Sequence, residues 1–460
     1  MNSKNMSGAK TNPATVAMIS LGCPKNLVDT EVILGHLPPE RYTIVTDAAN
    51  ATIIIVNTCA FIGDAKEESI DTILAMAQYK EQGSCAMLIV CGCLPQRYRE
   101  ELAAGLPEVD LFLGTGDAIH IGEIIDTWRT AAPQQLCHIS APAGLYEHDT
   151  PRLQASPFYT AYVKIAEGCN NRCSYCIIPT LRGPLRSRSI DSVVAEVRQR
   201  VAAGVIEINL IAQDITAYGR DRSDGASLEQ LLRQLIQIDE LRWLRLLYAY
   251  PEGVSDELLD LIAAHPKICP YLDLPLQHIA APVLKGMNRR LDSGATIALI
   301  EKIRRRIPHI TLRTTFIVGF PGETKEDFAT LHAFAARGLF DRVGVFTYSR
   351  EEGTAAAAYG AQVPDQIKEQ RREALMTTLG EIAREKNQRL IGSEIEVLVE
   401  GVSEETELLL QGRSISQAPD IDGITYINAG GANVGELVTV VITDAAEHDL
   451  VGHIKGSLDW

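Results

Sequence analysis

The chain reads EGCNNRCSYCIIPTLRG over residues 167–183, and this stretch holds three of its ten cysteines, Cys169, Cys173 and Cys176. The preceding run AYVKIA, 161–166, has the composition of a β-strand, so we expect the three thiols on the loop that follows a strand. Three thiolates at this CxxxCxxC spacing bind three irons of a 4Fe-4S cluster and leave the fourth iron open to a substrate. S-adenosylmethionine needs an open iron of this kind.

A zinc site and buried structural cysteines are the alternatives for this motif. Structural zinc takes four ligands, usually from CxxC pairs, and the nearest other candidates, Cys137 and His138, lie in a different segment. Inert cysteines do not suit a segment that also contains Asn, Arg, Ser and Gly. We therefore favour the iron–sulfur interpretation and leave zinc open.

The segment that begins at this strand alternates between candidate strands and helices. Helical patterns such as DSVVAEVRQRVAAG and SLEQLLRQLIQI separate the strands, which is typical of a partial or whole (β/α) barrel. The chemistry of such barrels sits at the carboxyl ends of their strands. The loop GFPGET leads into Thr324, where a capping box predicts the start of a helix. The six candidate strands are residues 161–166, 205–212, 244–249, 271–276, 312–320 and 342–348.

A second trio of cysteines stands in the first part of the chain. The runs VAMISLGC, TIIIVNTC and AMLIVCGC are short and apolar, and each ends in a cysteine: Cys23, Cys59 and Cys93. This repetition predicts βαβ units around a parallel sheet, with the cysteines at the carboxyl ends of the strands, where ligands collect. A free cysteine is often only a core residue. These three terminate their strands, however, and Cys23 lies in a Gly-Cys-Pro turn that exposes its thiol.

Changes of composition divide the chain into an α/β protein of three domains. Residues 131–158 are rich in Pro, Ala, Gln, Ser and His and predict a linker. A charged helical pattern over 365–392 closes the barrel region, and the short runs after it resemble a small antiparallel, OB-like β-barrel. The predicted domains are an α/β domain at 1–130, the linker at 131–158, the (β/α) barrel at 159–390 and the small barrel at 391–460.

The overall composition excludes several classes of protein. The formal net charge is −16, and broad binding of nucleic acid needs clustered Lys and Arg to neutralise phosphates. Ten cysteines without a secretory signal point to reduced thiols used for metal or catalysis. The longest apolar runs are far shorter than the roughly 20 residues of a membrane-spanning helix. We therefore expect a cytoplasmic protein without a membrane partner.

Both cysteine motifs resemble a known family. The CxxxCxΦC pattern, with aromatic Tyr175 before its last cysteine, resembles the radical S-adenosylmethionine superfamily. The stretches SLGCPKNLVDTE, NTCAFI and GCLPQRY resemble the N-terminal domain of the methylthiotransferase family, and the final segment is similar to a TRAM domain. The resemblance covers nearly the whole chain. It implies two 4Fe-4S clusters, an auxiliary one on Cys23, Cys59 and Cys93 and one that cleaves S-adenosylmethionine on Cys169, Cys173 and Cys176.

Within this family, PKNLVD and CIIPTLRGPLRSR resemble the branch that modifies a ribosomal protein, whereas tRNA-modifying members typically read GCQMN at the first cysteine. The implied reaction uses two S-adenosylmethionine molecules, one as methyl donor to a sulfur on the auxiliary cluster and one as the source of a radical. That radical removes a β-hydrogen from an aspartate of ribosomal protein S twelve. The implied partners are this basic small-subunit protein and an electron donor. A tRNA adenosine methylthiotransferase and a non-catalytic iron–sulfur module that binds RNA remain as alternatives.

Further candidate residues lie near the predicted barrel mouth. We predict Tyr175, Gln213, Gly319 and Glu323 as contacts of S-adenosylmethionine, because barrel function is carried by the loops after the strands. A plain role in loop structure is the alternative for each. Three arginines are candidates for holding the S-adenosylmethionine carboxylate or guiding an acidic target side chain, and a solvated basic loop is their alternative. They are Arg182, Arg186 and Arg188.

The cysteines outside the two trios have a simpler interpretation. Cys91 stands two residues before Cys93 in the same predicted strand, so it is a candidate substitute ligand. We expect ordinary packing for the other three, Cys85, Cys137 and Cys269.

The final segment is strongly acidic. Residues 391–460 contain thirteen acidic residues against two basic ones, Arg413 and Lys455. An RNA-binding β-barrel needs a positive groove with stacking aromatic residues, and this segment offers only Tyr426 and Trp460. We therefore expect the segment to attract a basic protein by electrostatic steering and to repel RNA. Solubility alone is the alternative explanation of its charge.

Overall fold

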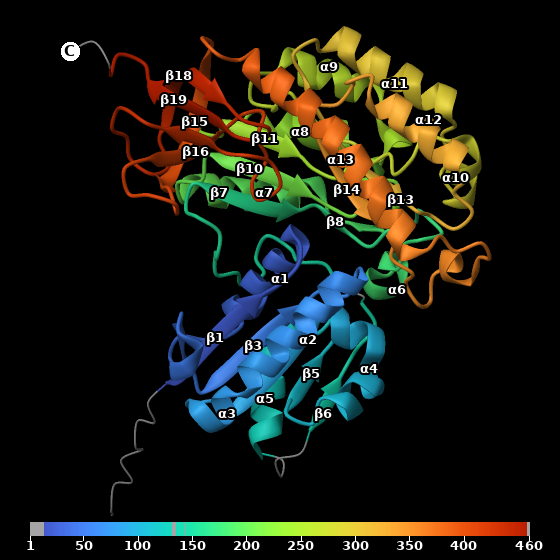
Figure 1. Cartoon of the computed structure of the whole chain (residues 1–460). Coiled ribbons are helices and arrows are strands. Elements are labelled where there is room, and N and C mark those ends of the chain that lie inside the picture. Colours follow the sequence, from blue (N-terminus) through green and yellow to red (C-terminus); the bar gives the residue numbers. More distant parts are fainter. Residues whose placement is uncertain (1–12, 131–134, 143, 458–460) are drawn as a thin grey trace, which may run out of the picture. The chain divides into compact units, whose positions relative to one another are not determined.

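The computed structural model describes residues 13–130, 135–142 and 144–457 (Figure 1). The chain divides into two compact units. The N-terminal unit comprises Met1–Ala155 together with Thr180–Gly183. The C-terminal unit comprises Ser156–Pro179 and Pro184–Trp460.

A six-stranded parallel sheet forms the centre of the N-terminal unit. Its strand order is β2-β1-β3-β4-β5-β6. The order in which strands are added to the sheet therefore reverses between β1 and β3, and we call this position the switch point. Every residue of β3 and β4 is buried, as expected for parallel strands covered on both faces. The strands are β1 (Ala14–Ser20), β2 (Tyr42–Val45), β3 (Ile53–Thr58), β4 (Met87–Gly92), β5 (Leu111–Leu113) and β6 (Leu136–His138).

Helices connect these strands and complete the predicted α/β domain. Helix α1 packs on β1 and β3, α2 on β3 and β4, and α4 on β4 and β5. Strand β6 lies within the stretch predicted as a linker. That stretch is therefore not all linker, since residues 136–138 pair with β5 and extend the sheet. Residues 131–134 and 143 of that stretch lie outside the described residues. The helices are α1 (Pro24–Gly35), α2 (Gly63–Ala77), α3 (Tyr79–Gln82), α4 (Cys93–Gly105) and α5 (Ile121–Thr130).

The C-terminal unit contains the predicted partial (β/α) barrel. Two parallel sheets, β7-β10-β11 and β12-β13-β14, are joined by a bridge between Leu244 and Ile268. Six strands follow one another in this order, each with a helix after it, so the prediction of six β/α units is confirmed. The strands are β7 (Thr160–Lys164), β10 (Glu207–Ile211), β11 (Trp243–Leu246), β12 (Tyr271–Asp273), β13 (Thr311–Val318) and β14 (Arg342–Thr347). The main helices are α7 (Ile190–Ala202), α8 (Leu228–Leu235), α9 (Asp256–Ala264), α11 (Ser293–Arg306), α12 (Lys325–Ala335) and α13 (Asp365–Gln388).

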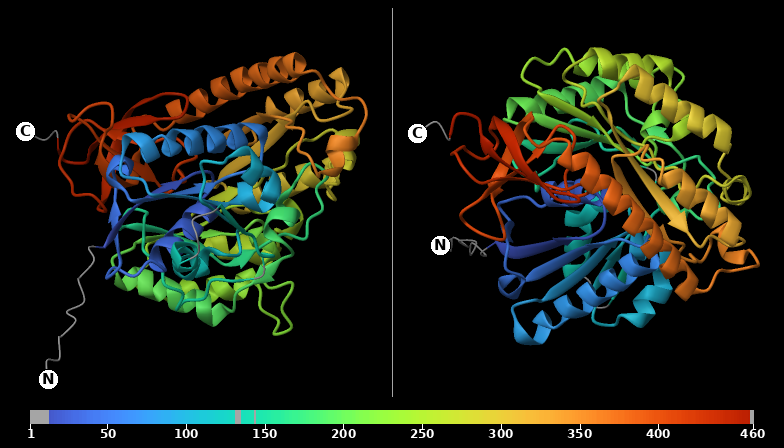
Figure 2. Two further views of the ribbon diagram at one scale, coloured as in Figure 1. Left: turned by 90° about the horizontal axis from the view of Figure 1, so that it is seen from below. Right: turned by 45° about the horizontal axis from the view of Figure 1, so that its top comes forward.

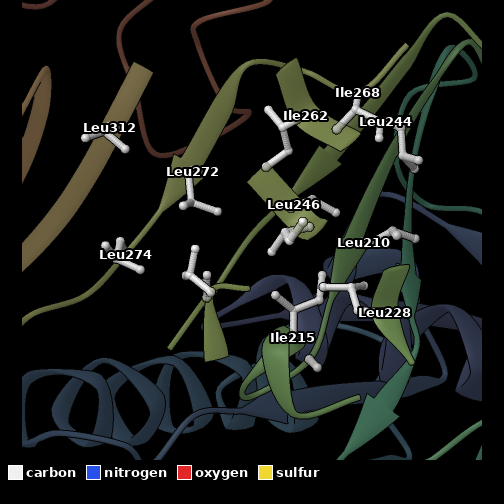
Figure 3. Packing of buried hydrophobic residues seen from close by; sticks show 14 of the residues in the cluster. Leu210, Ile215, Leu228, Leu244, Leu246, Ile262, Ile268, Leu272, Leu274 and Leu312 are labelled. Carbon is white, nitrogen blue, oxygen red and sulfur yellow. The ribbon is translucent and has the colours of Figure 1, made fainter. Parts of the chain in front are cut away.

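Aliphatic side chains from these strands and helices form the core of the unit. Figure 3 shows Leu210, Leu244 and Leu272 from strands packed with Ile262 from α9 and Leu228 from α8. All five are buried. The predicted capping box is also confirmed, because Thr324 and Asp327 each accept a hydrogen bond from the backbone of the other at the start of α12. The strand ends are therefore held on a rigid scaffold.

A closed five-stranded barrel ends the C-terminal unit, as predicted. Helix α13 packs along β13 and β14 of the (β/α) barrel and also contacts β18 of this smaller barrel. The chain leaves α13 to enter the smaller barrel (Figure 2). Because it is closed, the small barrel leaves no long edge strand exposed. Its strands are β15 (Glu394–Val402), β16 (Leu410–Ser414), β17 (Thr425–Ile427), β18 (Leu437–Ala445) and β19 (Leu450–Ile454).

Buried ion pairs attach the small barrel to the (β/α) barrel. Glu207, the first residue of β10, accepts hydrogen bonds from Arg245 of β11 and from Arg413 of β16. Burial by itself would raise the pKa of Glu207, but the two guanidinium groups outweigh it and lower the value to about 2. Tyr271 of β12 also donates to Asp422 of the small barrel at 2.7 Å. The small barrel therefore covers the amino ends of the barrel strands.

Candidate functional site

The cysteine loop of the C-terminal unit follows β7 and the two-residue strand β8 (Ala166–Glu167), as predicted. We call Cys169, Cys173 and Cys176 the central trio. All three are partly buried. The Asn171 amide N–H donates to Cys169 Sγ at 3.4 Å, and its side chain donates to Asp214 after β10 at 2.7 Å. The loop is thus held over the carboxyl end of the barrel, opposite to the small barrel.

Cys173 lies among a guanidinium group and two phenols. Arg289 Nη1 is 4.0 Å and Tyr250 Oη 3.9 Å from its sulfur, and Arg289 stacks on the Tyr250 ring with 3.9 Å to the ring centroid. Burial raises the pKa of Tyr175 well above its usual value, and Cys173 adds to this shift. The Tyr175 ring packs against a cluster that includes Met287 and Phe320. Tyr175 therefore lies next to the central trio, and its contact with S-adenosylmethionine stays a prediction.

Gln213 lies at the carboxyl end of β10 with one side-chain atom available. Its Nε2 donates to Glu167 Oε1 at 2.5 Å, and Glu167 Oε2 accepts from Lys164 at 2.6 Å. The Gln213 Oε1 atom is buried and has no hydrogen-bond partner among the described residues. A buried acceptor without a partner costs free energy, so this atom calls for a donor from a ligand or water.

Gly319 and Glu323 shape the loop after β13. Gly319 has a φ of +75°, and a Cβ at this position would lie 2.2 Å from Lys368 Cγ of α13. Glu323 Oε2 accepts from the Gly319 amide at 2.5 Å, while Oε1 accepts from Arg371 at 2.8 Å. Both carboxylate oxygens thus have partners in the protein. This favours the structural alternative for Glu323 over direct contact with S-adenosylmethionine.

The cysteines of the N-terminal unit meet at one edge of its sheet. We call Cys23, Cys59 and Cys93 the N-terminal trio. They follow β1, β3 and β4, which are neighbours in the sheet. The first two flank the switch point between β1 and β3, where open α/β sheets bind their ligands. The topology therefore brings together three thiols that are far apart in sequence.

Close backbone contacts fix this arrangement. Gly22 has a φ of +88°, and a Cβ there would lie 2.7 Å from Cys59 Cβ. Asn26 Nδ2 donates to the carbonyl oxygen of Thr58 at 2.9 Å, which ties the turn after β1 to the end of β3. Cys23 is the N-cap residue of α1, so its position is set by the start of that helix.

The thiols of the N-terminal trio influence one another. Burial raises the pKa of Cys59 to about 12, and the nearby thiols of Cys93 and Cys23 add to the shift. Burial also raises the pKa of Cys93, while Arg182 acts in the opposite direction. Thiols this hard to ionise become thiolates when a metal binds them.

The remaining sequence candidates have other surroundings. Cys91 packs in the core of the N-terminal unit with Ile55 and Leu113, which favours packing over its use as a substitute ligand. Arg188 is paired with Glu196 in the C-terminal unit at 2.5 Å, and Arg182 is paired with Asp29 in the N-terminal unit at 2.6 Å. Both guanidinium groups are buried in these ion pairs. This argues against the alternative of a solvated basic loop for Arg182 and Arg188.

The donor sets suit clusters better than single ions. In residues 13–130, 135–142 and 144–457, no three side chains of His, Cys, Asp and Glu are grouped closely enough for one metal ion. A 4Fe-4S cluster differs, because each thiolate binds its own iron and the sulfurs stand farther apart. Each unit offers three cysteine thiols of this kind. The residues present therefore fit two three-cysteine clusters.

Known proteins are similar to this chain over nearly its whole length. It is 60% identical over 444 residues to "Ribosomal protein uS12 methylthiotransferase RimO" of Syntrophotalea carbinolica, covering 96% of this chain and 97% of that protein. The protein of the same name from Geobacter sulfurreducens is 57% identical, with 98% and 100% covered. The chain belongs to the RimO family of radical S-adenosylmethionine methylthiotransferases. This family uses S-adenosylmethionine and 4Fe-4S clusters.

Family models match each domain of this RimO-family chain. The model described as "Uncharacterized protein family UPF0004" matches residues 15–114, the "Radical SAM superfamily" model 163–335, and the "TRAM domain" model 391–454. The three-domain prediction of fold class is thereby confirmed. We call the small C-terminal barrel the TRAM barrel from here on.

Solved structures share the fold at low sequence identity. A radical S-adenosylmethionine methyltransferase, TsrM from Kitasatospora setae, matches with a TM-score of 0.55 and 15% identity, covering 83% of this chain and 79% of that one. A cobalamin-dependent radical enzyme, OxsB, matches with a TM-score of 0.52 and 12% identity, covering 80% and 56%. These likenesses support the fold of the RimO-family chain and nothing finer. None of its described helices is both long and apolar enough to cross a membrane.

Several residues around the trios of this RimO-family chain are not among those predicted from its sequence. Asn26 belongs to the motif SLGCPKN, so its sequence position close to Cys23 is a signal that marks it. Arg289 and Tyr250 reach Cys173 from loops more than seventy residues away, and no local pattern marks them. Glu167 stands directly before the cysteine loop, but its pairing with Gln213 depends on the parallel alignment of β7 with β10.

Proposed function

We propose that this protein replaces a β-hydrogen of an aspartate of ribosomal protein uS12 with a methylthio group. The observation that carries the proposal is the near full-length identity of up to 60% to proteins named for this activity, in a chain with two complete cysteine trios. We infer a cytoplasmic reaction, because the substrate is a ribosomal protein.

In this proposal each trio holds its own 4Fe-4S cluster. When bound, the central cluster supplies the electron that cleaves S-adenosylmethionine, and the auxiliary cluster supplies the site of the transferred sulfur. The central trio would be oriented by Asn171, which ties its loop to Asp214, and by Arg289 beside Cys173. The N-terminal trio would be oriented by Asn26 at the switch point.

The polar group inside the barrel has a binding role in this proposal. Gln213 Oε1 is a buried acceptor that lacks a partner among the described residues, so it suits an N–H donor of S-adenosylmethionine. Lys164 holds Glu167, and Glu167 holds Gln213, through short hydrogen bonds. This chain of contacts fixes the direction of the acceptor. The electron donor and the use of a second S-adenosylmethionine molecule belong to the proposal as well.

The acidic TRAM barrel is proposed to attract the basic substrate. Several of its acidic residues already have internal partners: Glu400 binds Arg413, Asp422 binds Tyr271, and Asp420 binds Tyr162. The exposed charge that remains includes Glu404 and Glu407 in the turn between β15 and β16. Because this barrel covers the amino ends of the strands, it would tether the substrate and not line the central site.

A direct assay tests the proposal. Reconstituted protein, S-adenosylmethionine and a chemical reductant are incubated under argon with uS12, with small ribosomal subunits or with tRNA. We expect 5′-deoxyadenosine to be released and mass spectrometry to find the mass gain of a methylthio group on one uS12 aspartate. Modification of tRNA alone would favour the adenosine alternative. Absence of S-adenosylmethionine cleavage would favour a non-catalytic module.

A further inference from the structure

Arg182 is buried in the N-terminal unit beside a member of the N-terminal trio. Its side chain is 4% exposed. It belongs to Thr180–Gly183, a segment that lies in the N-terminal unit although its neighbours in sequence belong to the C-terminal unit. Its Nη2 atom lies 3.5 Å from Cys93 Sγ, within the range of an N–H···S hydrogen bond. A guanidinium group is thus directed at this trio.

Two residues of α1 hold the guanidinium group in this orientation. Arg182 Nη1 donates to Asp29 Oδ2 at 2.6 Å, and Nη2 donates to Asn26 Oδ1 at 2.6 Å. The planar fork of arginine turns such paired contacts into a fixed geometry. Asn26 also donates to the carbonyl oxygen of Thr58, next to Cys59. One hydrogen-bond network therefore connects the surroundings of all three cysteines.

The electrostatics of the site call for a positive group. Cys93 is only 6% exposed, and a buried thiolate or a cluster bound to it is costly without a compensating charge. Hydrogen bonds to the sulfurs and nearby charges set the reduction potential of an iron–sulfur cluster. A cation stabilises the reduced, more negative state. Asp29 offsets part of this effect, so the two side chains act with opposite signs.

We propose that Arg182 is a positioning residue that holds Cys93 toward the auxiliary cluster and sets the reduction potential of that cluster. The inference rests on the proposed function, which assigns the N-terminal trio to a second cluster. It assigns Asp29 the complementary role of anchoring the guanidinium group and moderating its charge.

The test uses the full chain with Cys169, Cys173 and Cys176 changed to Ala, so that only the auxiliary cluster is loaded. Potentiometric titration followed by electron paramagnetic resonance measures the ratio of reduced to oxidised cluster. We expect Arg182→Met to lower this ratio at fixed potential roughly tenfold, which is about 59 mV for a one-electron couple. Asp29→Asn is expected to raise it, because the cation then acts without its carboxylate.

Two further variants keep the test decisive if Arg182→Met loads poorly. Arg182→Lys keeps the charge and should retain the auxiliary iron, with a ratio between those of the parent and Arg182→Met. Arg188→Met removes another buried arginine, one paired with Glu196 at 2.5 Å in the C-terminal unit. It is the matched control and should leave the auxiliary potential unchanged.

The outcomes separate the inference from the proposed function. If the parent of this series binds no cluster, the assignment of the N-terminal trio fails, and the proposed function fails with it. If the parent binds a cluster but Arg182→Met and Asp29→Asn leave its potential unchanged, only the inference is overturned. Loss of auxiliary iron in Arg182→Met with retention in Arg182→Lys supports the positioning role. Equal loss in Arg188→Met would reduce the effect to general instability and overturn the inference.

Discussion

Each trio brings three thiols together, but the two trios do so by different means. The central trio lies within eight residues of sequence, on one loop after β7. The members of the N-terminal trio are separated by more than thirty residues each, and only the order of β1, β3 and β4 makes them neighbours. A local motif thus carries its own geometry, whereas a distributed site depends on the topology of the sheet. The two should therefore fail under different mutations.

The largest expected effect comes from removing either trio. Changing Cys169, Cys173 and Cys176 to Ala should leave about half the iron and abolish cleavage of S-adenosylmethionine, because a cluster with three cysteine ligands needs them all. Changing the N-terminal trio should also leave about half the iron, but cleavage should persist while methylthiolation stops. Iron analysis and 5′-deoxyadenosine release measure both. Cys91→Ala is the control, since its side chain packs in the core.

A wild type that holds only about four irons per chain after reconstitution would remove the basis for two clusters. In that case only the central trio would be assigned a cluster.

A large effect on stability is expected at the attachment of the TRAM barrel, in the unit that carries the central trio. Glu207→Gln leaves Arg245 and Arg413 without their shared carboxylate, and breaking such a buried pair costs about 3–5 kcal/mol in free energy of unfolding. Urea denaturation measures the loss. Iron on the N-terminal trio should persist. Glu396→Gln, in an exposed pair with Arg242, should change stability by less than about 1 kcal/mol.

The same carboxylate gives a dependence on pH. The folded pKa of Glu207 is lowered from 4.5 to about 2, so its stabilising contribution is complete above pH 4.5 and is lost as the pH falls toward 2. Glu207→Gln should flatten this part of the stability profile of the cluster-free protein. An identical acid profile in wild type and variant would contradict the assignment.

A glycine substitution should separate the trios more gently. In Gly22→Ala the new Cβ would lie 2.7 Å from Cys59 Cβ on a backbone with φ of +88°, so the turn at the switch point must shift. We expect reduced iron on the N-terminal trio, with S-adenosylmethionine cleavage by the central trio unchanged. Gly105→Ala is the control, because nothing lies within 4 Å of its Cβ position. Equal iron in both variants would show that the turn tolerates the displacement.

A smaller effect is expected at the barrel mouth. Gln213→Leu removes the acceptor proposed for S-adenosylmethionine, and the loss of one hydrogen bond of about 1 kcal/mol weakens binding about fivefold. Equilibrium dialysis with the loaded enzyme measures the Kd. Gln230→Leu on the exposed face of α8 should leave it unchanged. An unaltered Kd for Gln213→Leu would assign the orphaned oxygen to water.

The smallest effect concerns the TRAM barrel. Reversing Glu404, Glu405 and Glu407 to Lys should slow uS12 modification about two- to threefold at low salt, and the difference should vanish as salt shortens the Debye length from about 10 Å at 0.1 M to about 3 Å at 1 M. Uncoupled cleavage of S-adenosylmethionine should not change. Reversal of Glu240, Glu373 and Glu381, exposed on other surfaces, is the control. Equal slowing in both sets would leave solubility as the role of the acidic turn.

The sequence by itself determined the order of the domains and the central trio, because strand and helix patterns, the CxxxCxxC spacing and the capping box at Thr324 are local properties of the chain. It also marked the N-terminal trio, since each of its cysteines follows an apolar strand. Only the tertiary structure decided which residues surround the trios. Arg182 follows the central motif in sequence but lies beside Cys93, and Glu207 on β10 is paired with Arg413 of the TRAM barrel. The physical reason is that a buried charge needs a partner from wherever the fold brings one, and sequence distance does not limit that choice.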